Sequence, residues 1–150
     1  MSEEIRVSKR PFHILLVEDN VEDIYLTQEA MKESSIPYSL NVVRDGEEAM
    51  SYLLRQGKYA DVVQPDIILL DSNLPKKNGL EVLKEIKDNP DIRGIPVIAL
   101  STSSAQEDIQ KACDLKANCY IIKPINFDKF LKVIKSIMDY WFTVAALPGQ

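Results

Sequence analysis

Acidic side chains follow two apolar runs of the sequence, where a fold could bring them together. Glu18 and Asp19 follow residues 12–17, and Asp71 follows residues 66–70. At a separation of about 5 Å and an effective dielectric of about 20, each pair of like charges costs about 3 kcal/mol. Three converging carboxylates therefore predict a compensating cation, and oxygen ligands that leave room for water suit Mg²⁺ better than zinc.

A hydroxyl and a lysine follow two further apolar runs. Ser101 comes after residues 95–100, and Lys123 comes after residues 119–122. A carboxylate beside Mg²⁺ can attack phosphorus and form an aspartyl phosphate, whose charge then needs a cation and a hydroxyl donor. Taken alone, the acidic pair after the first run could simply cap a helix, whose N-terminus favours negative charge. The four run ends together favour a phosphoryl-accepting site.

The elements that must position these residues are visible as apolar runs alternating with segments of helical period. The runs are continuous, as in strands buried on both faces of a parallel sheet. Strands are expected at residues 12–17, 39–43, 66–70, 95–100 and 119–122, and helices after Asn20, over 46–54, over 79–87, from a capping box at 104–107, and over 125–142. This order predicts an open, doubly wound α/β sheet, in which function sits outside the carboxyl ends of the strands.

Two side-chain expectations accompany these elements. The helical period after Asn20, a plausible N-cap, predicts that Val21, Ile24, Gln28 and Met31 lie on one face. Two cysteines without metal-ligand or redox spacing, Cys113 and Cys119, are expected as buried thiols in a reducing compartment.

Bulk composition limits the class of protein. A chain of 150 residues fits one domain, and its net charge of −5 with scattered basic residues argues against direct nucleic-acid binding. The first residues lack the apolar core of a signal peptide, and no apolar run approaches the roughly 18 residues of a membrane span. We expect a cytoplasmic protein that contacts neither nucleic acid nor membrane.

The residues at the run ends closely resemble a known family. Glu18-Asp19, the segment 71–79, Ser101 and Lys123-Pro124 are similar, in that order, to the landmarks of response regulator receiver domains. The resemblance implies a flavodoxin-like (βα)5 fold with three α/β/α layers. It divides the chain into a flexible N-terminal segment (1–10), a receiver domain (11–142) and a C-terminal tail (143–150).

The resemblance implies that Asp71 accepts a phosphoryl group from a sensor histidine kinase in a Mg²⁺-dependent reaction. Glu18, Asp19 and Asp71 would bind the metal, together with the backbone carbonyl of Asn73. Lys123 would balance the phosphoryl charge. In this sequence Glu18 stands where Asp is commoner in the family, which keeps the carboxylate.

The resemblance also assigns the switch. Ser101, where Thr is commoner, would follow the phosphoryl group, and Tyr120 occupies the switch-aromatic position. Asn73 and Ser103 occupy positions that tune dephosphorylation. At a finer level, residues 73–77, 100–103 and 118–120 and the aromatic tail look like the stand-alone regulators paired with bacterial phytochromes, which makes a phytochrome-type kinase a candidate partner.

The expected fifth helix is apolar over two adjacent stripes, although one stripe suffices to pack on a sheet. We expect a homodimer through the face formed by the fourth helix, fifth strand and fifth helix; the alternative is that the tail folds back over the second stripe. The candidate dimer residues are Phe130, Val133, Ile137, Tyr140, Trp141 and Phe142.

Three other functions compete with this interpretation. A phosphatase of the haloacid-dehalogenase type also uses a strand-end Asp with Mg²⁺, but it needs a carboxylate where this chain has Asn73. A flavodoxin-like FMN carrier needs a phosphate loop after the first strand, where Glu18 and Asp19 would repel phosphate. A degenerate receiver would lack the acidic set. The sequence thus favours a phosphoacceptor switch that catalyses only its own phosphorylation and dephosphorylation, and not an enzyme.

Overall fold

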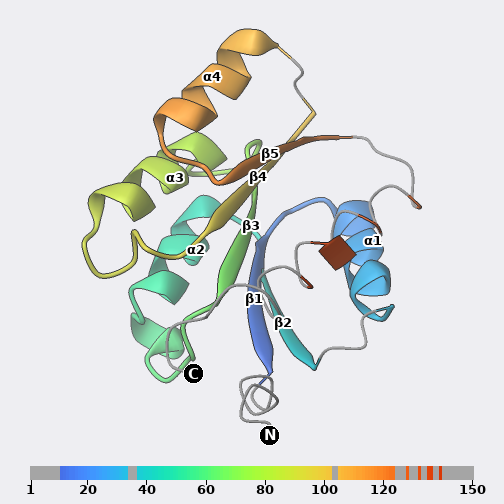
Figure 1. The fold of residues 1–150 in the computed structure, drawn as a ribbon. Coiled ribbons are helices and arrows are strands. Elements are labelled where there is room, and N and C mark those ends of the chain that lie inside the picture. The colour runs from blue at the N-terminus through green and yellow to red at the C-terminus, as the bar shows by residue number, and fades with distance from the viewer. Residues whose placement is uncertain are drawn as a thin grey trace, which may run out of the picture.

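The computed structural model describes residues 11–33, 37–102 and 105–123, and residues 128, 132, 135, 136 and 139. Its centre is a parallel sheet of five strands in the order β2-β1-β3-β4-β5 (Figure 1). The strands are β1 (Phe12–Val17), β2 (Tyr38–Val43), β3 (Ile67–Asp71), β4 (Val97–Ser101) and β5 (Cys119–Ile122). Each predicted strand is present, and β3 and β4 extend one residue further than predicted, so that Asp71 and Ser101 are themselves strand residues.

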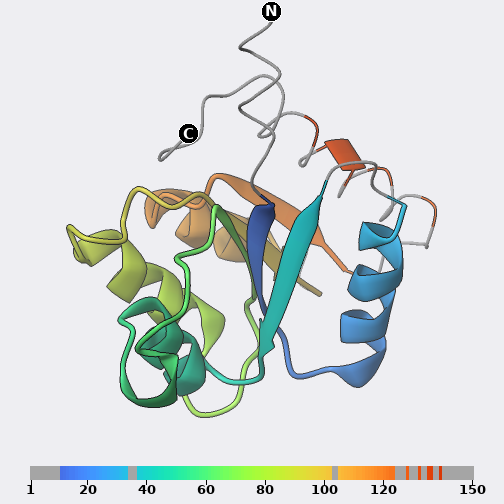
Figure 2. The same cartoon turned by 90° about the horizontal axis from the view of Figure 1, so that it is seen from below.

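Helices cover both faces of the sheet. They are α1 (Val21–Met31), α2 (Gly46–Leu53), α3 (Gly79–Asp88) and α4 (Gln106–Asp114), with a short 3-10 helix η2 (Gly57–Tyr59) after α2. Helix α1 lies on one face, and α2, α3 and α4 lie on the other (Figure 2). The prediction of a doubly wound α/β sheet is confirmed. The predicted fifth helix, residues 125–142, lies outside the described residues except at five positions, which are helical.

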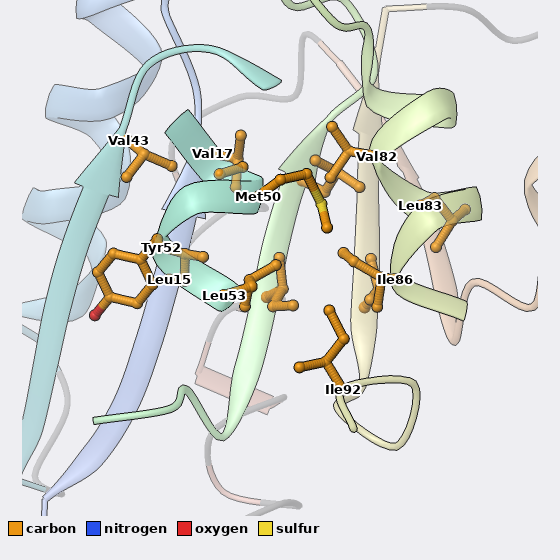
Figure 3. Packing of buried hydrophobic residues seen from close by; sticks show 14 of the residues in the cluster. Leu15, Val17, Val43, Met50, Tyr52, Leu53, Val82, Leu83, Ile86 and Ile92 are labelled. Carbon is orange, nitrogen blue, oxygen red and sulfur yellow. The ribbon is translucent and has the colours of Figure 1, made fainter. Parts of the chain in front are cut away.

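A core fills the space between the sheet and helices α2 and α3. Successive β3 residues from Ile67 to Leu70 are all at most 2% exposed, so both faces of this central strand are covered. Figure 3 shows how the helix side chains meet the strands, with labels on Leu15, Val17, Val43, Met50, Tyr52, Leu53, Val82, Leu83, Ile86 and Ile92. This packing fixes where β3 lies in the core, and therefore the position of Asp71 at the end of the strand.

The inward face of α1 agrees only in part with the predicted one. Val21 is 65% exposed and Gln28 is also exposed, whereas Ile24 packs against the core and Met31 is buried as predicted. Thr27 and Ala30 are buried as well. The buried Thr27 hydroxyl donates a hydrogen bond to the Asp23 carbonyl at 2.9 Å, so its burial leaves no unmet donor. The predicted face is therefore half right: Ile24 and Met31 pack inward, whereas Val21 and Gln28 do not.

Two further expectations were wrong. Helix α4 begins at Gln106 with Ala105 as its N-cap and no side-chain cap bond, one residue after the predicted capping serine, which lies outside the described residues. Cys113 and Cys119 are free but exposed, not buried. Cys119 is on the edge strand β5, and α4 buries only Ala112, so neither position reaches the interior.

Candidate functional site

The strand register brings the predicted polar residues to one edge of the sheet. Asp71 of β3 is level with Leu100 of β4, and Ser101 of β4 is level with Ile122 of β5. Strand β1 pairs with β3 up to Val17 and Leu70, so the residues that follow β1 emerge beside Asp71. The carboxyl ends of four strands therefore converge, as expected for the functional edge of an open α/β sheet.

An acidic cluster forms at this edge. Ligand oxygens of Glu18, Asp19 and Asp71 all lie within 4.8 Å of one another, and Glu18 and Asp71 are only 1% and 4% exposed. Backbone N–H groups orient the two buried carboxylates: that of Asn20 donates to Glu18 Oε2 at 3.2 Å, and that of Asn73 donates to Asp71 Oδ1 at 3.2 Å. These hydrogen bonds fix the orientation of the two buried carboxylates without a bound ligand.

The cluster is short of positive charge. Burial, together with the neighbouring Asp71 and against a lowering by Lys123, raises the pKa of Glu18 to about 7. A carboxyl group so placed binds a proton unless another cation is present. Three carboxylate donors grouped in this way match the oxygen-only ligand set that Mg²⁺ takes in proteins. The residues at this edge therefore fit a divalent cation.

Lys123 contributes a positively charged side chain to the site. Its Nζ lies 2.9 Å from Glu18 Oε1, 2.8 Å from Asp23 Oδ2 and 3.7 Å from Asp71 Oδ1. Burial alone would lower the pKa of Lys123, but hydrogen bonds to Asp23 and Glu18 raise it above its ordinary value. The backbone N–H of Lys123 donates to the Ser101 carbonyl, which fixes the start of the side chain beside β4.

The loop after β3 passes very close to Asp71. Gly79, the first residue of α3, donates its N–H to the Ser72 carbonyl at 3.1 Å. A Cβ at Gly79 would lie 2.2 Å from the Asp71 carbonyl oxygen, so only glycine fits here without moving the backbone. Asn78 then caps α3 in a reciprocal capping box with Glu81. Loop and helix together hold the end of β3 in place.

A cavity of about 520 Å³ opens beside the acidic cluster. It extends from the cluster toward α4 and β5, and its lining includes Asp19, Asn73, Ser101, Asp108 and Tyr120. Ser101 is 3% exposed at the end of β4. The next residue, Thr102, is exposed and accepts a hydrogen bond from the Asn73 side chain at 3.4 Å. Of the neighbouring hydroxyl residues Ser101 and Thr102, Ser101 is therefore the one that lines the cavity.

The structure brings together most of the predicted site, and adds one residue. Glu18, Asp19, Asp71 and Lys123 meet directly, and Ser101, Tyr120 and Asn73 line the adjoining cavity. Ser103 and the predicted dimer residues, Phe130, Val133, Ile137, Tyr140, Trp141 and Phe142, lie outside the described residues. Asp23 was not predicted, because an acid in the first turn of a helix is ordinarily explained by the helix dipole.

This fold and site define a response regulator receiver domain. The family model for the response regulator receiver domain matches residues 14–135, and the chain belongs to this family of phosphoacceptor switches in two-component signalling. The chain is 45% identical to response regulator Rcp1 of Synechocystis sp. over 142 residues, which cover 95% of this chain and 97% of that protein.

Two solved structures support the same assignment. The phosphorylated cyanobacterial phytochrome response regulator RcpA is 48% identical, with a TM-score of 0.87 over 93% of this chain and 100% of that one. The Mn²⁺-bound form of Rcp1 is 45% identical, with a TM-score of 0.85 over the same shares. Among the described residues, no helix is both long and apolar enough to cross a membrane.

Proposed function

We propose that Asp71 accepts a phosphoryl group from a sensor histidine kinase, in a Mg²⁺-dependent reaction in the cytoplasm. The observation that carries this proposal is the convergence of three carboxylates and a buried ammonium group at the carboxyl edge of the sheet. The similarity to the phytochrome response regulators Rcp1 and RcpA supports a phytochrome-type kinase as the donor.

Each group has a separate task in the transfer. A carboxylate oxygen of Asp71 attacks the phosphorus of the donor phosphohistidine, and the bond from phosphorus to the imidazole nitrogen breaks. Glu18 and Asp19, with the Asn73 carbonyl, would hold Mg²⁺, which neutralises charge on the phosphoryl oxygens when bound. Support for this metal site comes from the grouping of the carboxylates and from the Mn²⁺-bound form of Rcp1.

Lys123 and Ser101 would contact the oxygens of the phosphoryl group directly. The Lys123 ammonium group, 3.7 Å from Asp71 Oδ1, lies near enough to balance a phosphoryl oxygen after a small movement. The Ser101 hydroxyl donates to another oxygen, and Asn73 and Ser103 set how readily water reaches the adduct. No separate substrate is turned over, so the domain catalyses only its own phosphorylation and dephosphorylation.

The output passes through the cavity beside the site. Movement of Ser101 toward the phosphoryl group leaves space that the Tyr120 ring occupies, because both residues line the same cavity. The surface of α4 and β5 then changes, and with it the contacts to a partner. We propose that this partner is a second copy, bound through α4, β5 and residues Phe130 to Phe142 of the expected fifth helix.

Intact-mass measurement tests the phosphoacceptor assignment. The protein is incubated with acetyl phosphate with and without Mg²⁺, and we expect one phosphoryl adduct that requires the metal. Asp71→Asn should remove the adduct while leaving the folded structure, and Asp61→Asn, at an exposed position, should retain it. No adduct in the wild type, under conditions that label another receiver domain, would favour a role as an interaction module only.

The output proposal has its own test. Tyr120→Ala should be phosphorylated like the wild type but should lose the phosphorylation-dependent change in partner binding or dimerisation. Sedimentation of the wild type and of this variant, with and without acetyl phosphate, measures the assembly directly. A monomer in every state would refute the proposed dimer.

A further inference from the structure

Lys123 is shared between the acidic cluster and a carboxylate outside it. Its Nζ is as close to Asp23 Oδ2, at 2.8 Å, as to Glu18 Oε1, at 2.9 Å. Asp23 lies in the first turn of α1 and is not part of the group of carboxylates that approach within 4.8 Å of one another. The ammonium group therefore has two partners inside the proposed metal site, Glu18 and the more distant Asp71, and one outside it, Asp23.

Binding of a metal creates a conflict at Glu18. Its Oε1 accepts from Lys123 and its Oε2 accepts from the Asn20 N–H, so a cation must displace or share one of these donors. If Lys123 gives up Glu18, its ammonium group is left in a site where its side chain is only 10% exposed. A buried charge that loses its counter-ion is strongly destabilising.

We propose that Asp23 is a positioning residue, the standing counter-ion that lets Lys123 release Glu18 to Mg²⁺. The proposal rests on the metal site of the proposed function. With Asp23 present, Lys123 keeps one short ion pair while Glu18 turns to the metal. Without Asp23, the other carboxylates within 4 Å of the ammonium group among the described residues are Glu18 and Asp71, both metal ligands. Lys123 then competes with Mg²⁺ for them.

Calorimetric titration with Mg²⁺ tests this role. Asp23→Asn should weaken Mg²⁺ binding about fivefold or more relative to Glu22→Gln. Glu22 is the matched control because it is an exposed acid in the same first turn of α1, so both variants remove one negative charge there. Asp23→Glu should restore most of the affinity. Equal losses in Asp23→Asn and Glu22→Gln would overturn the proposal.

A second background separates the ion pair from long-range charge. In Lys123→Met the ammonium group is gone, so adding Asp23→Asn should no longer weaken Mg²⁺ binding beyond the control. An undiminished loss in that background would mean that Asp23 acts only through its charge, and would overturn the proposal. Urea unfolding without metal should be measured on the wild type, Asp23→Asn, Lys123→Met and the double variant. The free energies of unfolding should show a nonzero coupling between Asp23→Asn and Lys123→Met.

The outcomes also separate this inference from the proposed function. A wild type that binds no Mg²⁺ contradicts the metal site, and the role of Asp23 fails with it. A wild type that binds Mg²⁺ and is phosphorylated, with no specific effect of Asp23→Asn, leaves the proposed function intact and rejects Asp23 alone.

Discussion

The raised pKa of Glu18 predicts that Mg²⁺ binding weakens as the pH falls. A metal and a proton compete for this carboxylate, which is 1% exposed and has a pKa of about 7. About nine in ten Glu18 side chains are then protonated at pH 6, and about one in ten at pH 8. The apparent dissociation constant of Mg²⁺ should therefore rise about tenfold from pH 8 to pH 6, which corresponds to about 1.4 kcal/mol.

The assay is calorimetric titration at a series of pH values in buffers of equal ionic strength. Mg²⁺ binding near neutral pH should release a proton, which appears as a dependence of the heat on the buffer's ionisation enthalpy. Glu18→Gln should bind Mg²⁺ more weakly at every pH and lose this part of the pH dependence. Equal affinity at pH 6 and pH 8 in the wild type, or the same slope in Glu18→Gln, would refute the reasoning.

Three further predictions concern stability, each measured by urea unfolding. Gly79→Ala should destabilise the fold by about 1–3 kcal/mol and slow adduct formation, because the added Cβ meets the Asp71 carbonyl. The control Gly94→Ala, whose Cβ would have no atom within 4 Å, should change stability by less than about 0.5 kcal/mol. Asn20→Ala should cost about 1 kcal/mol, because the Asn20 side chain caps α1. Without metal, raising the pH from about 5 to about 7.5 should destabilise the wild type relative to Glu18→Gln by about 2 kcal/mol, because the Glu18 pKa lies above its ordinary 4.5 and ionisation favours the unfolded chain. A parallel pH dependence of these two proteins would contradict the last prediction.

The sheet and the main residues of the site could be predicted because they depend on patterns along the chain. Continuous apolar runs indicate buried parallel strands, and in an open α/β sheet the residues after those runs meet at one edge. That rule was enough to group Glu18, Asp71 and Lys123, although Lys123 and Glu18 are 105 residues apart. No side-chain contact had to be known.

Other features depend on directions that no periodicity records. The ion pair of Asp23 with Lys123 arises from how the lysine side chain crosses from the end of β5 to α1, a contact over 100 residues. The burial of Thr27 depends on a bond to its own helix, and the exposure of Cys119 depends on its place in an edge strand. These are properties of packing, and the sequence predicted them wrongly or not at all.

Strand β5 is only four residues long, and Ile121 is the one side chain it buries. So small an apolar contact fastens an edge strand weakly, yet the residue that follows it, Lys123, is bound to carboxylates after β1 and in α1. Among the described residues, this ammonium group thus links the end of β5 to the segment after β1 and to α1. A ligand that draws Lys123 away from Glu18 and Asp23 would remove these two ion pairs, so we expect occupancy of the site at Asp71 to change how firmly β5 is held at the edge of the sheet.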